Sequence, residues 1–184
     1  MSGAGTISAG THAEESDAGR VVAFQRLADQ RLEASYRLAN AILGDEGQAQ
    51  DAVHDAVVLA WRRWSSLRER ARFDAWFDRI VVNVCRDRLR QASRRRASDI
   101  ADVSLSTPDA TAEIHRRLVV EQALARLKPD DVVVLALRHV LDLELADIAG
   151  LLELPIQTVN TRLRSARARL RDSLDQSSSD QVPR

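Results

Sequence analysis

The sequence contains one cysteine, one lysine and no long apolar run, and each scarcity excludes a class of protein. Cys85 is the only cysteine, so it cannot form a disulfide within the chain, which excludes a disulfide-stapled secreted fold. No stretch approaches the roughly 18 to 20 apolar residues that a membrane-spanning helix needs. The N-terminus lacks the basic and then apolar pattern of a secretion signal. We therefore expect a cytoplasmic protein without membrane insertion.

Side-chain patterns typical of catalysis are also missing. The four histidines, at 12, 54, 115 and 139, are scattered and show neither an HExxH pattern nor Cys/His ligand spacing. The seven glycines form no phosphate-binding loop, and no nucleophile-elbow motif is present. The sequence predicts that the protein is not an enzyme and that it holds no cofactor and no metal.

The charges balance in number but not in position. The 27 basic and 27 acidic residues give a formal net charge of zero, which argues against a general polyanion binder. Lys128 is the single lysine, and arginines concentrate at 86–96 and 162–171. Arginine makes bidentate hydrogen bonds to phosphate and guanine, so these runs are either DNA-contact surfaces or solvated helix faces.

Apolar spacing predicts a first helical unit over residues 20–92. Residues 1–19 are rich in Gly, Ser, Ala and Thr, which predicts a disordered tail. Three segments then show helical periodicity: 24–43, 46–64 and 73–90. Gly44 is a natural helix stop, and 65–72 reads as a loop. The aromatic residues fall on apolar stripes, so we expect them in the core and not as a platform for stacked bases: Trp61, Trp64, Trp76 and Phe77.

A second helical unit is expected over residues 114–174. Residues 93–113 lose the periodicity and contain Pro108, which predicts a flexible linker, and 175–184 reads as a second tail. Pro129 marks a helix start. The run Val132–Val134 could form a buried strand, but its neighbours are helical, so we expect a helix. The predicted fold is all-α, with two small domains joined by a flexible linker.

Residues 144–171, ELADIAGLLELPIQTVNTRLRSARARLR, carry the most informative pattern. A short helix over 145–152 is followed by a tight turn at Glu153 and Leu154, and Pro155 opens a second helix where proline is tolerated. A turn this short predicts a helix-turn-helix unit. One side of the second helix is apolar, at Ile156, Val159, Leu163, Ala166 and Leu170.

The opposite side of that second helix carries hydrogen-bonding groups in its centre and arginines at its margins. This arrangement suits the major groove of DNA, with central residues on bases and marginal residues on phosphates, although a solvated amphipathic helix would look partly similar. The predicted DNA-binding residues are Gln157, Thr158, Asn160, Thr161, Arg162, Arg164, Ser165, Arg167 and Arg169.

Taken together, three segments resemble the small extracytoplasmic-function sigma factors of the sigma-70 family. They are DAVHDAVVLAW at 51–61, RFDAWFDRIVVNVCRDRLR at 72–90, and the helix-turn-helix, and the resemblance spans residues 24–174. Their common order and spacing is more specific than any one motif. The resemblance implies that 20–92 is sigma region 2, which binds core polymerase and reads the minus-ten element. It implies that 114–174 is sigma region 4, which reads the minus-thirty-five element.

The resemblance also implies roles for residues in the first unit. One face of the second expected helix would bind the clamp of the largest subunits of core RNA polymerase, through Asp51, His54, Asp55, Val58 and Arg62. One face of the third would contact the minus-ten element of promoter DNA, through Arg79, Asn83, Arg86 and Arg90. The polymerase flap region and an anti-sigma factor are the further partners that the family implies.

The chain departs from the family pattern at three places. The helix-turn-helix turn has Glu153 where the family usually has glycine, so a positive φ there would be strained. Gln157 replaces a second glycine, and Glu144, a weak N-cap, replaces a serine. The loop 65–72 contains three arginines and no glycine.

Two other functions fit parts of the pattern. A stand-alone repressor or activator would bind its operator as a dimer through the same helix-turn-helix. A helical adaptor would bind only protein, with its arginines solvated. Neither requires the 51–61 segment followed by the Asn83 and Arg86 face, so the sequence favours a sigma factor.

Overall fold

The computed structural model describes residues 17–98, 119–120 and 122–179. Their regular structure consists of α1 (Asp17–Leu43), α2 (Glu46–Arg62), the short 3₁₀ helices η1 (Trp64–Ser66) and η2 (Arg70–Arg72), α3 (Phe73–Ser98), α5 (Pro129–His139), α6 (Leu145–Leu152) and α7 (Ile156–Ser179). Residues 119–120 and 122–125 are helical as well. No strand occurs in these ranges, and the predicted all-α fold is confirmed. No helix in the described part of the chain is long and apolar enough to cross a membrane.

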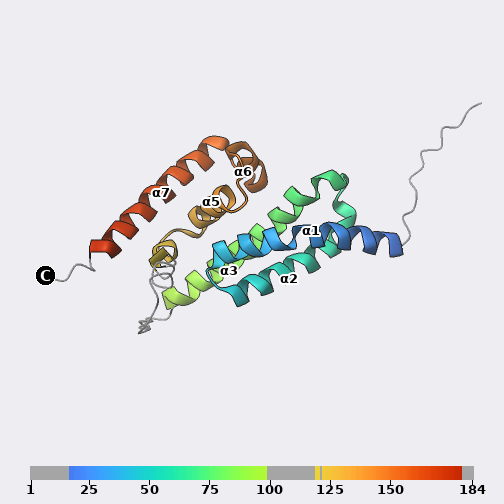
Figure 1. Ribbon diagram of the computed structural model, residues 1–184, viewed down its shortest axis with the longest axis horizontal. Helices are drawn as coiled ribbons and strands as arrows, with labels where there is room; N and C mark the ends of the chain where they lie inside the picture. The colour runs from blue at the N-terminus through green and yellow to red at the C-terminus, as the bar shows by residue number, and fades with distance from the viewer. Residues whose placement is uncertain (1–16, 99–118, 121, 180–184) are drawn as a thin grey trace, which may run out of the picture.

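The first unit is a bundle of α1, α2 and α3 (Figure 1). Gly44 takes a φ of 69° after α1, and the Asp45 side chain caps α2 by accepting a 2.7 Å hydrogen bond from the Gln48 amide. Edge-to-face aromatic contacts fill one end of the core, where the ring centres of Phe24 and Trp64 lie 5.4 Å apart.

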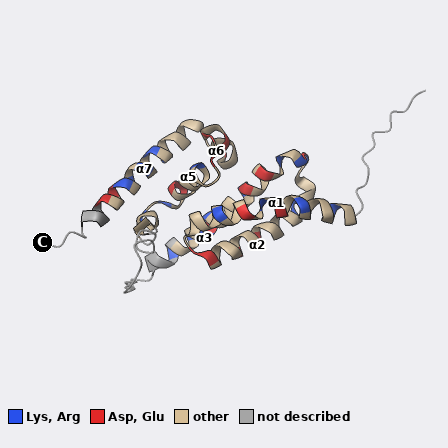
Figure 2. Cartoon of the chain, in the orientation of Figure 1, with Lys and Arg blue, Asp and Glu red and all other residues tan. Residues whose placement is uncertain are grey.

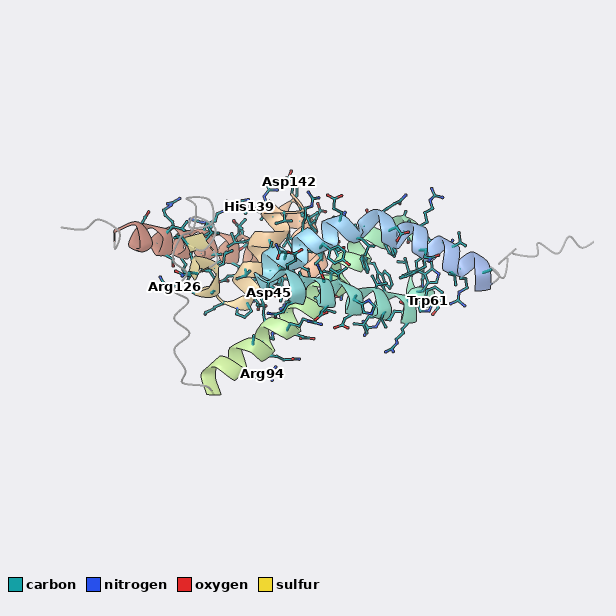
Figure 3. The ribbon with its side chains drawn as sticks, turned by 60° about the horizontal axis from the view of Figure 1, so that its bottom comes forward. Asp45, Trp61, Arg94, Arg126, His139 and Asp142 are labelled. Carbon is teal, nitrogen blue, oxygen red and sulfur yellow. The ribbon has the colours of Figure 1, made fainter. Side chains whose placement is uncertain are left out.

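The aromatic side chains divide between core and surface. Trp64 and Phe77 are buried as expected, and Trp76 is half-buried. Trp61, labelled in Figure 3, is 41% exposed, so the prediction that it lies in the core is wrong for the outer side of its ring. Its inner side packs edge-on against Phe24, with ring centres 5.3 Å apart.

A buried ion pair joins α1 to α3. Arg31 Nε donates a 3.0 Å hydrogen bond to Asp78 Oδ1, and Asp78 is 2% exposed. Burial raises the pKa of Asp78, while the hydrogen bond from Arg31 acts in the opposite direction. This pair fixes the register of α1 on α3.

The second unit contains α5, α6 and α7. Pro129 opens α5 directly after an extended Lys128, and the residues from Asp131 to Leu137 are all buried. The Val132–Val134 run is therefore helical, as expected. Its β-branched side chains are covered because α5 contacts α1 and α3 on one side and α6 and α7 on the other.

The helix-turn-helix forms where it was predicted. Glu153 ends α6 in the left-handed conformation, with φ 54° and ψ 44°, and the Leu154 amide donates a 3.0 Å hydrogen bond to the Ala149 carbonyl. The strain expected for a non-glycine residue at this turn is thus present. Glu144 makes no side-chain capping bond to α6, and its carboxylate lies 3.3 Å from Arg138 Nη1.

The helices run beyond the limits expected from the sequence. α1 begins at Asp17, α3 continues to Ser98 through the arginine triplet that was expected to open the linker, and α7 continues to Ser179. Polar residues can extend a helix without any apolar stripe to reveal it, and the arginines of α3 also have high helix propensity. The rest of the expected linker, most of the expected N-terminal tail and half of the expected C-terminal tail lie outside the described residues.

The two units pack against each other. α5 contacts α1 and α3, α6 contacts α3, and the buried apolar side chains of both units form one cluster. α7 lies on the far side of α5 from the first bundle (Figure 1). The interface therefore covers one side of α3, the helix that carries the predicted minus-ten residues.

Candidate nucleic-acid interface and partner surface

The outer face of α7 presents the predicted DNA-binding residues. Val159, Leu163 and Ala166 are buried on its inner side. Gln157, Asn160, Thr161, Arg164, Arg167 and Arg169 are exposed, while Thr158, Arg162 and Ser165 are half-buried. Ile156 was expected on the apolar stripe but is 48% exposed. A helical side chain lies over the turn that precedes it, and Ile156 is the first residue of its helix.

The arginines of α7 divide into two groups. Arg162 Nη1 lies 3.1 Å from Asp130 Oδ2, and Arg169 Nη1 lies 2.8 Å from Asp131 Oδ2, so both tie α7 to the first turn of α5. Arg164 has no ion-pair partner among the residues that the structure describes. Blue bands along α7 mark this series (Figure 2). Arg164 therefore remains available for a base, whereas Arg162 and Arg169 already neutralise carboxylates.

The predicted minus-ten face of α3 is turned toward the second unit. Asn83 is exposed. Arg79 Nη2 lies 2.5 Å from Glu153 Oε1, in the helix-turn-helix turn. Arg86 Nη2 lies 2.8 Å from Asp130 Oδ1, and Arg90 Nη2 lies 3.8 Å from the same oxygen. Sequence reasoning found the arginines but missed these carboxylates, because pairing between distant segments leaves no local pattern.

The predicted polymerase-binding face of α2 borders a groove. Asp51, His54, Asp55 and Arg62 are exposed and Val58 is half-buried, as an accessible face requires. An open groove of about 750 Å³ runs between α2 and α3, lined by Asp55, Val58 and Arg62 from α2 and by Val84 and Arg88 from α3.

Arg88 is a residue of this face that sequence reasoning missed. Its Nη2 donates a 2.6 Å hydrogen bond to Asp55 Oδ2, and its Nη1 lies 4.0 Å from Asp51 Oδ2. The α2 acids therefore face a fixed positive charge. The arginine lies more than thirty positions away in the sequence, and only the packing of α2 on α3 brings it there.

Outside these faces, the described residues form neither a metal site nor a reactive thiol. Among the described residues, no group of three or more His, Cys, Asp or Glu side chains could hold a metal ion. Cys85 is fully buried, and burial raises the pKa of its thiol to about 12, so the reactive thiolate is suppressed.

A helix-turn-helix packed on a second helical unit with its own arginine face defines a two-domain DNA-binding protein. Comparison with known proteins identifies the family. Residues 27–95 match the model of sigma-70 region 2, and residues 117–170 match that of sigma-70 region 4. The extracytoplasmic-function sigma factor SigM of Mycobacterium tuberculosis is 34% identical over 153 residues, which are 83% of this chain and 78% of that protein.

Two solved structures share the fold. CnrH, in complex with the cytosolic domain of CnrY, has a TM-score of 0.59 at 25% identity, covering 86% of this chain and 98% of CnrH. The sigma factor RpoE of Bartonella quintana, in complex with the anti-sigma factor NepR, has a TM-score of 0.57 at 20% identity, covering 84% and 93%.

The chain belongs to the extracytoplasmic-function sigma factors of the sigma-70 family, and its function is to direct transcription initiation at promoters. The family resemblance found in the sequence is confirmed. The stand-alone repressor or activator is not favoured, because both sigma regions are present in the order that the family requires.

Proposed function

We propose that this sigma factor binds core RNA polymerase through the outer face of α2 and reads promoter DNA with α3 and α7. The observation that carries the proposal is the division of charge among three helix faces, of which those on α2 and α7 are exposed and that on α3 is turned toward the second unit. The α2 face carries Asp51 and Asp55, whereas the predicted faces of α3 and α7 carry arginines. Acidic faces repel DNA, so the α2 face suits a protein partner and the other two suit nucleic acid.

The polymerase-binding residues are Asp51, His54, Asp55, Val58 and Arg62, and Arg88 belongs with them. Val58 lies in the groove between α2 and α3, which Asp55, Arg62 and Arg88 also line. An apolar centre with a charged rim is the usual composition of a protein interface. We assign this face to the clamp of the largest polymerase subunits, and the second unit to the flap region.

DNA reading divides between two helices. On α7, Thr161 and Arg164 lie in the middle of the exposed strip and would contact base edges, while Arg167 would contact phosphate. On α3, Asn83 would contact the minus-ten element, with Arg86 as a phosphate contact. Polymerase supplies the catalysis, so this chain needs no catalytic residue, metal or cofactor of its own.

The same proposal places the protein in the cytoplasm, where core polymerase and promoter DNA are found. An anti-sigma factor is the remaining proposed partner. It is supported by the two related structures, which are complexes of sigma factors with CnrY and NepR.

Charge reversal on α2 tests the polymerase-binding face. Asp51→Arg with Asp55→Arg should reduce co-purification with core polymerase at least tenfold, since reversal adds like-charge repulsion to the lost attraction. Asp51→Arg should be measured alone as well, because it leaves the Arg88 pair with Asp55 in place.

Asp29→Arg is the matched control for this experiment. Asp29 is exposed on α1, and its substitution makes the same change of charge as the single Asp51→Arg variant, away from the α2 face. Circular dichroism should show equal helicity in all variants. Wild-type co-purification of the α2 double variant would refute the assignment.

A further inference from the structure

Asp130, at the start of α5, forms ion pairs with arginines of both units. Its Oδ1 lies 2.8 Å from Arg86 Nη2 and 3.8 Å from Arg90 Nη2, both on α3. Its Oδ2 lies 3.1 Å from Arg162 Nη1 on α7. The Arg86 side chain is only 20% exposed. One carboxylate therefore engages guanidinium groups that the sequence predicted to contact the minus-ten element, from Arg86 and Arg90, and the minus-thirty-five element, from Arg162.

Glu153 makes a second contact between the units. It ends α6 in the helix-turn-helix turn and pairs with Arg79 at 2.5 Å. Arg79 precedes Arg86 on α3 by about two helical turns, so Glu153 and Asp130 contact the same side of that helix. Asn83 lies between these two points and is exposed.

Apolar packing supports the same arrangement. α5 and α6 both contact α3, and α5 also contacts α1, within one cluster of buried side chains. Ala41 of α1 lines the same groove as Val132, Leu135 and Ala136 of α5. The ion pairs are therefore part of an interface between the units and not isolated surface contacts.

We propose that Asp130 and Glu153 form an acidic latch that holds the free sigma factor closed and occupies the arginines of its own minus-ten face. This inference rests on the proposed DNA-reading role of α3. Phosphates and the latch carboxylates compete for the same guanidinium groups, so the closed conformation cannot place Arg79 or Arg86 on DNA. Binding of core polymerase to an open conformation would then release the latch.

Such a latch lowers the apparent affinity of every partner that needs the open form. The apparent affinity equals the intrinsic affinity multiplied by the fraction of molecules that are open. Partly exposed ion pairs are individually weak and are screened by salt. Removing both latch carboxylates should therefore tighten binding of core polymerase by about two- to tenfold, because less free energy is lost in opening.

A distance measurement tests closure directly. Spin labels on Gln30→Cys in α1 and Ala168→Cys in α7, both exposed positions, report the separation of the units by pulsed dipolar spectroscopy. The buried Cys85 does not compete for the label. The full-length chain should give one narrow distribution at the separation in this structure.

The latch variant is Asp130→Asn with Glu153→Gln, and its matched control is Asp142→Asn with Asp147→Asn. Both pairs remove two negative charges from the second unit, and Asp142 and Asp147 are exposed. The latch variant should give a broad distribution at longer distances, as should the wild type in 1 M salt, and the control should stay narrow. A broad wild-type distribution, or a latch variant as narrow as the wild type, would overturn the closed conformation.

Binding of core polymerase tests inhibition separately. The latch variant should bind two- to tenfold more tightly than the wild type, and the control should match the wild type. If the distances change as expected while polymerase affinity does not, the latch closes the protein without inhibiting it, and the proposal is wrong. If no variant binds polymerase, the proposed function fails, while the distance measurement still reports on closure.

Discussion

At the scale of single residues, arginines serve three purposes in this chain. Arg31 is half-buried, donates a hydrogen bond to the buried Asp78 and so holds α1 to α3. Arg162 links α7 to α5 through Asp130, and Arg164 is exposed without an ion-pair partner among the described residues. The sequence shows arginines at helical spacing in each case, and only the position of the nearest carboxylate separates a structural arginine from one that is free to bind DNA.

Replacing Arg164 and replacing Arg167 should have different effects on DNA binding. Arg164→Ala should cost about 1 to 3 kcal/mol against the preferred base and relax preference at that position, as expected for a direct base contact. Arg167→Ala, a marginal residue, should weaken binding to all sequences equally and lower the salt slope by about 1. The measurement is polymerase-dependent binding to a panel of minus-thirty-five variants across salt concentrations. Equal weakening of every variant by Arg164→Ala would show that α7 is oriented differently.

The buried Asp78 should make stability depend on pH. Its pKa is raised above the unfolded value of 3.8 by burial, so the folded state binds the proton more tightly. Stability from this group is fully present below pH 3.8 and is lost as the pH rises through the raised pKa. Asp78→Asn removes the titrating carboxyl, so the stability of the wild type relative to this variant should fall as the pH rises above about 4. Urea unfolding of both proteins at a series of pH values measures this difference in stability. A wild-type advantage that grows with pH would mean that the hydrogen bond from Arg31 outweighs the effect of burial on the pKa of Asp78.

At the scale of elements, helix identity could be predicted and helix ends could not. The Val132–Val134 run was correctly assigned to a helix because its neighbours were helical, and the Asp45 start of α2 was also correct. The ends of α3 and α7 were missed, because the polar turns at 94–96 and after Leu174 carry no apolar periodicity. The turn at Glu153 was identified, together with its strain, because only three residues separate the two helices and the chain must change direction within them.

The strain at Glu153 gives a prediction for the helix-turn-helix. Left-handed backbone costs a non-glycine residue about 1 to 2 kcal/mol, and the extra freedom of glycine in the unfolded chain offsets part of this. Glu153→Gly should therefore be more stable than Glu153→Ala by about 0.5 to 1 kcal/mol. Both variants lose the Arg79 pair equally, so their difference isolates the backbone. Chemical denaturation measures it, and equal stabilities would show that the left-handed turn is not strained.

At the scale of the whole molecule, the sequence predicted two units but not their contact. The linker composition suggested independent halves, yet α5 packs on α1 and α3. Interfaces between domains depend on surfaces assembled from distant segments, and neither Asp130 nor Arg86 shows its partner in its own neighbourhood. The α2 face was likewise predicted from local spacing, whereas Arg88 entered it only through the packing of α2 on α3.

Limited proteolysis tests whether the two units are held together by their packing or only by the covalent linker. Cleavage of the free protein should begin within residues 99–115, where apolar content is low, and α3 should protect the arginine triplet before it. The two fragments should then stay together in gel filtration at low salt and separate after Asp130→Asn with Glu153→Gln. Fragments that separate without these substitutions would argue that the covalent linker alone joins the units.

The central claim is that this chain directs core RNA polymerase to promoters by reading two separate elements. In-vitro transcription with purified core polymerase on a library of random DNA fragments tests it most directly. We predict that transcripts start from specific fragments only when the protein is added, and that those fragments share two short motifs at a constant spacing. Asp51→Arg with Asp55→Arg should abolish these transcripts. Transcripts that do not depend on the protein, or a protein that instead binds a palindromic duplex tightly without polymerase, would contradict the account.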